Sequence, residues 1–519
     1  MTGEWRLGLC TVWTVAAGLS GLAPADAQPA RYFGIQVTDD QTRRGVPLVE
    51  LRTVDGTSYF TDSNGIVALD DPVLMGHRVF LFVTSPGYEY PKDGFGYAGV
   101  AFGVRPGGRA EVAVKRLNIA ERLYRVTGAG IYRDTVLLGR QAPIEEPLLN
   151  AQVAGQDSVL ALPWRGRIYW FFGDTSRPAY PLGLFHTSGA TSTLPGNGGL
   201  APSVGIDLTY FVDETGFSRA MCPLPGEGPV WLDGLAAVPG DGGEEQLVAH
   251  YSRVRGLEAT LEHGLAVFDE AAAVFRKHTQ FDLSMTWQAP RGHPFRFREA
   301  DTEYLLFATP FVHTRARANL ASLADQTSYE SYTCLMPGTR YEKGSAEVER
   351  GPDGKLVWGW KRATDPVTQQ QERELLDAGT IHPDEAVYQV CDLDTGKPIL
   401  MHAGSIAWND FRRKWIMIAV QSFGETSFLG EVWFTEAGSP MGPWRWAKRI
   451  VTHNRYSFYN PLHHPFFDQD GGRLIYFQGT YSRTFEGDVP PTPRYDYNQM
   501  MYRLDLSDPR LPQPLAPAP

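Results

Sequence analysis

The sequence predicts an all-β protein: a small N-terminal β-sandwich followed by a larger body of short strands arranged as a five-bladed β-propeller. Gly, Pro, Trp and Tyr are plentiful, with 54, 38, 13 and 23 residues, a composition that favours short strands joined by turns. From residue 157 onward, a polar turn followed by an aromatic or aliphatic strand recurs along the chain. The 519 residues exceed what one hydrophobic core usually supports, so at least two domains are expected.

Residues 1–27 are predicted to be a signal peptide. Arg6 precedes an apolar run that extends to Leu22, and Ala25, Asp26 and Ala27 form a small-residue cleavage pattern. A transmembrane anchor is the alternative, but the run is short and contains Gly, Ser and Thr. No later segment is apolar for long enough to cross a membrane. We therefore expect a protein without a membrane anchor that is exported to the periplasm or the exterior.

The cysteine spacing and the net charge argue against several kinds of site and partner, namely zinc, nucleic acid and anionic membranes. Removal of the leader leaves Cys222, Cys334 and Cys391, whose wide spacing matches no zinc pattern and leaves both one disulfide and three buried thiols open. The net charge of −11 is accompanied by no Lys/Arg block, so nucleic acid and an anionic membrane surface are not expected partners. A neutral or weakly charged partner fits this balance better.

Residues 28–120 are expected to form the N-terminal sandwich. Its predicted strands, punctuated by Gly and Pro, lie at 32–37, 48–53, 79–83 and 110–114. The turn Asp-Ser-Asn-Gly at 62–65 reads as a hairpin turn, with a calcium site as the less favoured alternative. This turn, the Val-Thr-Asp segment at 37–39 and the turn and strand at 45–49 together resemble the corresponding parts of the transthyretin-like regulatory domains of many secreted enzymes. The resemblance implies a spacer or docking module.

The propeller is expected to span residues 146–508, with 121–145 as a linker or first strand and 509–519 as a Pro-rich tail. The strands that define the repeat lie at 168–172, 246–251, 304–309, 414–421 and 474–480. The widest gap between them contains 369–377, a charged stretch with helical character that predicts an insertion. A two-sheet sandwich is the alternative architecture.

Several motifs in this region resemble a known family. The Gly-Gln-Asp turn at 155–157 and the Phe-Gly-Asp-Thr turn at 172–175 are similar to those of five-bladed propellers that include the secreted D-arabinan-cleaving glycosidases. The Ser-Pro-Met-Gly-Pro-Trp turn at 439–444 and the Tyr-Asn-Pro run that starts at Tyr459 look like motifs of five-bladed furanosidases. Gln156 departs from the usual Thr before the first Asp. The resemblance implies glycoside cleavage, with Asp157 and Asp174 as the catalytic pair.

The two aspartates also point to this chemistry on their own. Each follows an apolar stretch or lies in a turn, where strand ends can face a cleft. Their separation leaves room for a strand, a turn and a return strand, so both can come from one blade. Glycoside cleavage needs one carboxylic acid to protonate the leaving oxygen and one carboxylate as base or nucleophile. The sequence does not assign these roles, and turn capping is the structural alternative.

Further residues are candidates for substrate contact. Arg177 and Tyr180 follow the second aspartate on a loop expected beside the site. His464 and Tyr481 are candidates for a hydrogen bond to a sugar hydroxyl and for ring stacking. Glu258, Glu262 and Glu425 lie near predicted strand ends and could supply a third carboxyl. No calcium pattern is present, so the metal stays unknown, although a propeller channel can hold an ion.

Three functions follow from these patterns. The first is a secreted glycoside hydrolase acting on a polysaccharide or oligosaccharide, with furanose-containing substrates in view. The second is a non-catalytic carbohydrate-binding or surface-interaction propeller. The third is a polysaccharide lyase that uses Tyr and His. Propellers host all three, so fold alone does not separate them.

Overall fold

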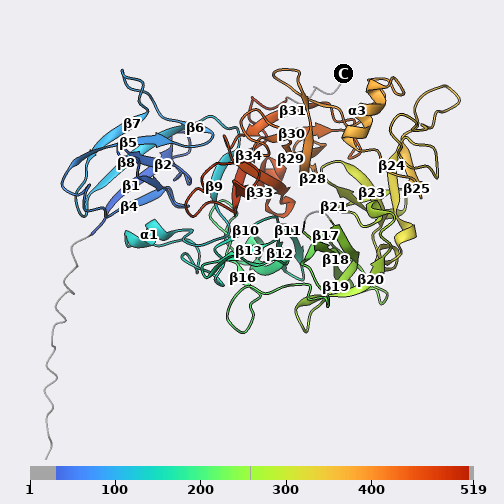
Figure 1. Ribbon diagram of the computed structural model, residues 1–519, viewed down its shortest axis with the longest axis horizontal. Helices are drawn as coiled ribbons and strands as arrows, with labels where there is room; N and C mark the ends of the chain where they lie inside the picture. The colour runs from blue at the N-terminus through green and yellow to red at the C-terminus, as the bar shows by residue number, and fades with distance from the viewer. Residues whose placement is uncertain (1–30, 257–258, 513–519) are drawn as a thin grey trace, which may run out of the picture.

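A computed structural model describes residues 31–256 and 259–512 (Figure 1). Strands make up most of the regular secondary structure of the described residues, which confirms the all-β prediction. The predicted signal peptide, Glu258 and the end of the predicted Pro-rich tail lie outside them. Within the two described ranges, no helix is both long and apolar enough to cross a membrane.

The N-terminal part of the described chain folds into two four-stranded sheets around one hydrophobic core. The first sheet has the order β4 (Ile66–Leu69), β1 (Phe33–Asp39), β8 (Arg109–Arg116) and β6 (Tyr88–Glu89). The second has the order β3 (Ser58–Phe60), β2 (Glu50–Thr53), β5 (Arg78–Thr84) and β7 (Gly99–Gly103). Alternation drives the packing: in β5, Val79, Leu81 and Val83 are buried while the side chains between them are more accessible.

Over the described residues, the larger body holds six further sheets, and the five larger ones follow one another along the chain (Figure 1). The first contains β11 (Leu160–Trp164), β12 (Arg167–Phe172), β15 (Ser188–Thr193) and β16 (Thr209–Tyr210). The second contains β17 (Val230–Pro239), β18 (Glu245–Arg255), β19 (Ala259–Asp269) and β20 (Val274–Phe281). The third contains β21 (His293–Glu299), β22 (Thr302–Ala308), β23 (Val312–Arg317), β24 (Glu330–Thr333) and β25 (Gly359–Arg362).

The fourth and fifth sheets complete this body. The fourth contains β28 (Met401–Asn409), β29 (Lys414–Gln421), β30 (Val432–Ala437) and β31 (Trp446–Val451), extended by β26 (Val390–Asp392) and β27 (Pro398–Ile399). The fifth contains β32 (Ser457–His463), β33 (Leu474–Ser482), β34 (Asn498–Asp505) and β9 (Glu121–Arg125). Its outer strand β9 therefore comes from the chain before the first sheet, and pairs antiparallel with β34.

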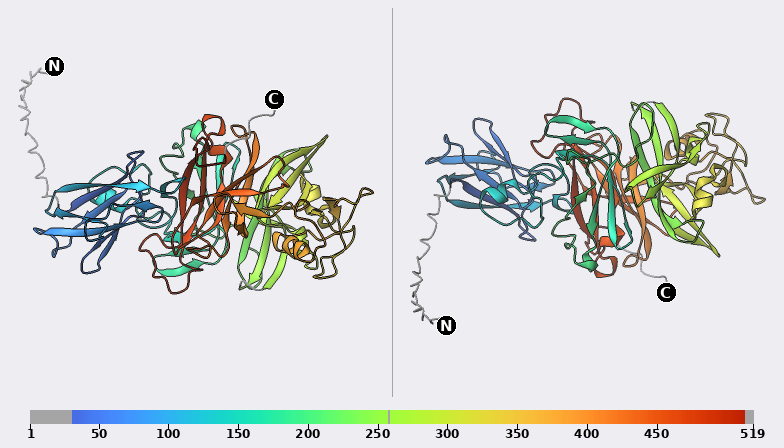
Figure 2. Two further views of the ribbon diagram at one scale, coloured as in Figure 1. Left: turned by 90° about the horizontal axis from the view of Figure 1, so that it is seen from above. Right: turned by 90° about the horizontal axis from the view of Figure 1, so that it is seen from below.

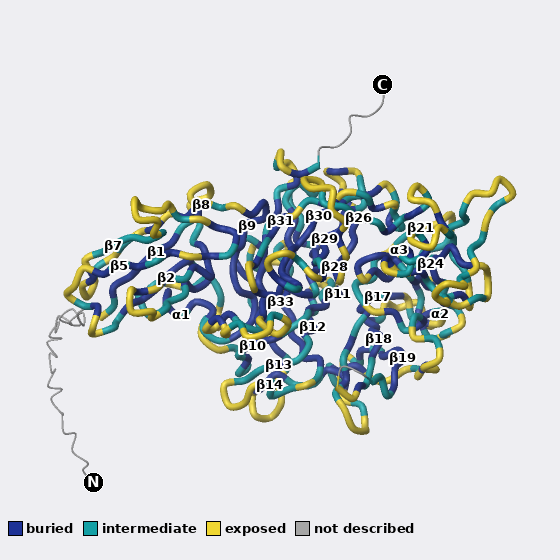
Figure 3. The backbone as a smooth tube through the Cα atoms, turned by 45° about the horizontal axis from the view of Figure 1, so that its top comes forward, coloured by how far each residue is buried: buried dark blue, intermediate teal, exposed yellow. Residues whose placement is uncertain are grey.

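Neighbouring sheets share hydrophobic cores, and the sharing closes into a cycle. Successive cores join the first sheet to the second, the second to the third, the third to the fourth and the fourth to the fifth. A further core joins the fifth sheet back to the first. The first strands β11, β17, β21, β28 and β32 line a common cavity of about 490 Å³. Buried residues are concentrated in the strands of the sheets, while many of the peripheral loops are exposed (Figure 3).

Helices and a small extra sheet connect these elements. The helices are α1 (Arg133–Leu137), α2 (Leu320–Ala324) and α3 (Gln369–Asp377), and short 3₁₀ turns lie at Pro195–Asn197, Thr286–Gln288, Gln326–Ser328, Pro465–Phe467 and Asp470–Gly472. The extra sheet has the order β10 (Gly155–Gln156), β13 (Thr175–Arg177) and β14 (Tyr180–Leu184). The predicted helical insertion coincides with α3, which Thr368 and Gln371 cap reciprocally.

The N-terminal module packs against the fifth sheet, and the additional views show it beside that sheet (Figure 2). The buried guanidinium of Arg122, on β9, donates from Nε to the carbonyl of Pro47 at 3.1 Å. The hydroxyl of Tyr495 donates to the carbonyl of Thr61 and accepts the backbone N–H of Leu48. Buried polar contacts of this kind join the two parts through both ends of the larger body.

Candidate active site

Asp157 and Asp174 lie opposite each other where two neighbouring strand pairs separate. Leu160 on β11 pairs with Phe171 on β12, whereas Gln156 on β10 pairs with Thr175 on β13. Both aspartates thus fall at the point where the chain passes from one sheet to the other. The Gly173 N–H donates to the carbonyl of Asp157 at 2.8 Å, and the Asp157 N–H donates to the carbonyl of Asp174 at 3.3 Å. Backbone hydrogen bonds therefore hold the segments of the two predicted catalytic residues side by side.

Gly173 leaves the space that the Asp157 carboxyl occupies. A Cβ atom at this position would lie 2.0 Å from Asp157 Oδ1. Any larger residue must therefore displace the carboxyl or the turn. Gly173 of the Phe-Gly-Asp-Thr run therefore allows the segments that carry the two aspartates to approach closely.

Strands of the fifth and first sheets support the turn at Asp157. The Ser158 N–H donates to Thr480 Oγ1 at 2.8 Å, and the Asn460 side chain donates to Ser158 Oγ at 2.8 Å. Buried Gln156 donates to Ser188 Oγ at 2.6 Å and accepts the Tyr210 hydroxyl at 2.8 Å. These contacts fix the backbone on both sides of the carboxyl.

Each carboxylate has aromatic hydrogen-bond donors. The Trp231 indole Nε1–H donates to Asp174 Oδ1 at 2.8 Å. The Tyr459 hydroxyl donates to Asp157 Oδ2 at 3.1 Å, and the Tyr497 side chain also hydrogen-bonds this carboxyl. The donors come from three separate parts of the chain, namely β17, β32 and the segment before β34. Closure of the cycle of sheets is what brings them to one place.

The environments of the two carboxyls differ. Burial, followed by the neighbouring charge of Asp174, raises the pKa of Asp157 to about 7, against the opposing effect of the two tyrosines. Burial also raises the pKa of Asp174, while the hydrogen bond from Trp231 opposes this shift. Asp157 thus has two causes that raise its pKa, burial and the charge of Asp174, whereas burial is the cause that raises the pKa of Asp174.

Arg177 and Tyr180 lie on the hairpin formed by β13 and β14, directly after Asp174. The guanidinium of Arg177 stacks on the ring of Phe217 at 5.0 Å, and Tyr180 is exposed. Both therefore lie on the loop where the sequence predicts them, and their contact with a substrate stays a prediction.

His464 and Tyr481 are core residues, which contradicts their predicted exposure to substrate. His464 has no accessible surface and packs against Trp170 with ring centroids 5.3 Å apart; burial lowers its pKa to about 3. Tyr481 is also buried and stacks on Tyr456 at 4.3 Å. The prediction was wrong because the fifth sheet packs on both faces, so strand alternation does not bring either ring to an open surface.

The predicted third carboxyls do not join the pair. Glu262 is buried, which raises a carboxyl pKa, but hydrogen bonds from Tyr251, Arg253 and Lys277 lower it to about 2. Glu425 is exposed, and its hydrogen bond with Lys397 lowers its pKa. Glu258 lies outside the described residues. Glu262 and Glu425 are therefore explained by ion pairs.

Sequence reasoning missed several residues of the site. Tyr459 and Asn460 stand in the Tyr-Asn-Pro run that carried the family resemblance, but the pattern did not connect them with Asp157. Tyr497 gave no signal in the sequence. Asp233, on β17, is a buried carboxyl with no hydrogen bond to either catalytic candidate within the described residues: burial raises its pKa to about 6, and its carboxylate accepts the N–H groups of Gly234 and Gly292.

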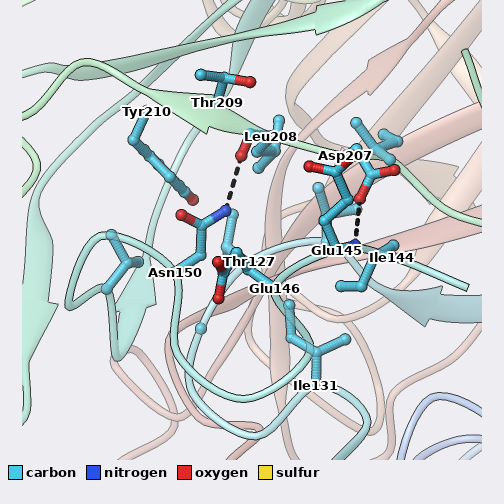
Figure 4. A pocket seen from close by; sticks show the side chains of 14 residues that line it. Thr127, Ile131, Ile144, Glu145, Glu146, Asn150, Asp207, Leu208, Thr209 and Tyr210 are labelled. Carbon is cyan, nitrogen blue, oxygen red and sulfur yellow. Dashed lines mark hydrogen bonds between the residues drawn. The ribbon is translucent and has the colours of Figure 1, made fainter. Parts of the chain in front are cut away.

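A separate small cavity, of about 40 Å³, lies beside the first sheet and includes neither catalytic candidate (Figure 4). Glu145, Glu146 and Asp207 are among its lining residues. The Glu145 N–H donates to Asp207 Oδ1, and the Asn150 amide donates to the Leu208 carbonyl (Figure 4). Over residues 31–256 and 259–512, no group of three or more His, Cys, Asp or Glu side chains is arranged to hold a metal ion. The three described cysteines are free thiols.

Comparisons with known proteins give structural likenesses alone. No protein-family model matches the chain, and no curated protein matches it. An exo-beta-1,3-galactanase from Phanerochaete chrysosporium is 13% identical, with a TM-score of 0.35, over 76% of this chain and 66% of its own. An endo-arabinase from Bacteroides thetaiotaomicron is 10% identical, with a TM-score of 0.32, over 69% and 98%.

A third solved structure has a different activity. An N-acetylgalactosamine deacetylase from F. plautii is 12% identical, with a TM-score of 0.32, over 75% of this chain and 96% of its own. Likenesses with TM-scores this low carry no inference about the chemistry of this chain, so the function is argued from the site itself.

Proposed function

We propose that the protein is a secreted glycoside hydrolase that cleaves a polysaccharide or oligosaccharide through Asp157 and Asp174, with furanose-containing glycans as the first substrates to test. One observation carries the proposal: backbone hydrogen bonds hold the segments of Asp157 and Asp174 side by side, and burial raises the pKa of both carboxyls. Glycoside hydrolysis requires one protonated and one ionised carboxyl at the same bond.

In the proposed reaction, the Asp157 carboxyl gives its proton to the glycosidic oxygen as the bond between that oxygen and the anomeric carbon breaks. The Asp174 carboxylate either removes a proton from the attacking water or attacks the anomeric carbon itself. In the second route, water later cleaves the glycosyl ester while Asp157 acts as base. The anomer released first, followed by NMR, distinguishes inversion from retention.

The architecture is consistent with this assignment. We interpret the closed cycle of five sheets as a five-bladed propeller, with β9 completing the last blade. The N-terminal pair of sheets is interpreted as the transthyretin-like module. Export through the N-terminal leader would bring the enzyme to polysaccharides outside the cytoplasm.

The lyase alternative is less well supported by the side chains near Asp157. Burial and the Asp157 carboxylate raise the pKa of Tyr459 well above its usual value, so its hydroxyl is a poor base at neutral pH. His464 has no accessible surface from which to act. A non-catalytic carbohydrate-binding role remains the alternative that the experiment must separate.

The test incubates the purified protein with arabinans and other plant, algal and bacterial polysaccharides. Reducing ends and unsaturated products are measured in parallel. Release of reducing ends without unsaturated products supports hydrolysis. Binding to a glycan with no release supports the non-catalytic alternative, and unsaturated products support the lyase.

A further inference from the structure

Four aromatic rings form a continuous series that begins at the candidate active site. The hydroxyl of Tyr459 contacts Asp157, and the Tyr459 ring lies 5.2 Å from the ring of Phe485. Phe485 lies 6.5 Å from Phe428, and Phe428 lies 4.8 Å from Phe423. We call Phe423, Phe428 and Phe485 the aromatic platform.

Phe485 and Phe423 of the platform are exposed, whereas Phe428 between them is partly buried. Tyr459 is 5% exposed, Phe485 is 41% exposed and Phe423 is 70% exposed. Exposed apolar rings gain nothing from the fold, and grouped ones commonly mark a surface that a ligand covers. The platform is therefore continuous with the candidate site at one end and open to a ligand at the other.

The backbone of Phe423 supports the same interpretation. Its φ of 58° lies in the left-handed region, which is unfavourable for a bulky residue. The Phe423 N–H donates to the carbonyl of Phe428 at 2.9 Å, so the segment closes on itself around the two rings. A strained backbone that holds an exposed aromatic ring is a feature found at binding sites.

Glu486 fixes the platform in place. One of its carboxylate oxygens accepts the Phe428 N–H at 3.0 Å, and the other accepts the Leu429 N–H at 3.3 Å and the Ser457 hydroxyl at 2.6 Å. These bonds tie the segment that carries Phe428 to the segment that carries Phe485 and to the start of β32. A fixed surface loses little conformational entropy when it binds a ligand.

We propose that the aromatic platform binds consecutive sugar rings of a neutral glycan whose cleaved bond lies at Asp157. The apolar C–H faces of sugars pack against aromatic rings. Neighbouring rings of the series are tilted by 46° to 84°, so successive rings suit separate sugars of a chain better than one small flat ligand. This inference rests on the proposed function, because it takes Asp157 as the point of cleavage. The platform would make the enzyme prefer long substrates to short ones.

The test compares Phe423→Ala with Phe423→Trp, which keeps an aromatic ring, and with Phe95→Ala as a matched control, since Phe95 is 89% exposed on the N-terminal module. Binding of D-arabinan and L-arabinan is measured by affinity electrophoresis, and kcat and KM are measured on each polymer and on a chromogenic arabinofuranoside. We expect Phe423→Ala to raise Kd and KM for a polymer about three- to tenfold. The kcat of Phe423→Ala should not change, nor should its KM for the short arabinofuranoside. Phe423→Trp and Phe95→Ala should keep the wild-type Kd and KM for the polymer.

Each outcome separates the two proposals. Unchanged polymer binding and KM in Phe423→Ala overturn the platform and leave hydrolysis standing. If Phe423→Ala weakens glycan binding by a protein that releases no product, glycan binding at the platform is supported, while cleavage at Asp157 is overturned. A dimer of the wild type that Phe423→Ala dissociates, measured by light scattering, assigns the surface to a second copy of the chain and overturns the platform.

Discussion

Asp157 and Asp174 share a backbone hydrogen bond, from the Asp157 N–H to the Asp174 carbonyl at 3.3 Å, yet their side chains have different partners. Tyr459 and Tyr497 contact the first carboxyl, and Trp231 contacts the second. The two aspartates are therefore neighbours, but different hydrogen-bond donors lower the pKa of each carboxyl. This arrangement yields predictions about pH dependence, stability and geometry.

The rate should depend on pH with a bell-shaped profile. Asp157 must be protonated to act as acid, so kcat/KM should fall as the pH rises through about 7. Asp174 must be ionised, so kcat/KM should also fall in acid, at a pH above the usual aspartate value because burial raises the pKa of Asp174. Initial rates from pH 3 to 9 measure both limbs. A flat profile through neutral pH is incompatible with Asp157 as acid.

The two aromatic donors should shift opposite limbs of this profile. Trp231→Phe removes a hydrogen bond that lowers the pKa of Asp174, so the acid limb should move up by about one pH unit. Tyr459→Phe removes a donor that lowers the pKa of Asp157, so the alkaline limb should move up by a similar amount. Movement of the same limb in both variants would contradict the separate assignment of acid and base.

Asp157→Asn should stabilise the protein at alkaline pH. The pKa of Asp157 is higher in the folded state than in the unfolded state, so its stabilising contribution is full below the unfolded value and is lost as the pH rises through about 7. The uncharged amide avoids this loss. The variant should therefore gain about 1–3 kcal/mol over the wild type at pH 8.5.

Denaturant unfolding at pH 4.5 and pH 8.5 provides the measurement. The stability difference should shrink at pH 4.5, where the wild-type carboxyl is protonated in the folded state. Asp233→Asn is not a suitable control because burial also raises the pKa of Asp233. Glu425→Gln, at an exposed ion pair, serves instead. An Asp157→Asn effect equal at both pH values would show that deprotonation is not its cause.

Gly173→Ala should reduce activity without unfolding the protein. The added Cβ would lie 2.0 Å from Asp157 Oδ1, so the carboxyl must turn away from its position opposite Asp174. We expect kcat to fall at least tenfold, since small displacements of catalytic groups are costly. Gly196→Ala, where a Cβ meets no atom within 4 Å, is the matched control. Full activity of Gly173→Ala would mean that the placement of Asp157 is not critical.

Local patterns predicted a good part of this structure. The strand expected at 414–421 is β29, and the helical stretch expected at 369–377 is α3, because period and capping are local properties. The approach of Asp157 and Asp174 could also be predicted, since a single hairpin connects them. The donors Tyr459 and Tyr497 could not, because closure of the sheets, about 300 residues later in the chain, brings them there.

The burial of both His463 and His464 could not be predicted from local sequence patterns. Alternation predicts that one of two adjacent side chains on a strand points away from the core, but His463 is 3% exposed and His464 is 0% exposed. His464 packs among Trp170, Phe466 and Phe467, while His463 contacts Asp468 at 2.8 Å. Layers on both faces of the sheet bury both rings, and the sequence alone does not reveal that second layer.

The most direct test of the carboxyl pair measures turnover and binding of one glycan by the wild type, Asp157→Asn and Asp174→Asn. The account predicts that each substitution lowers kcat at least about 100-fold, because each removes one member of an acid–base pair. It also predicts that Kd for the glycan stays within about threefold of the wild-type value. Turnover at the wild-type rate in either variant, with the fold intact by circular dichroism, would contradict the assignment of Asp157 and Asp174 as the catalytic pair.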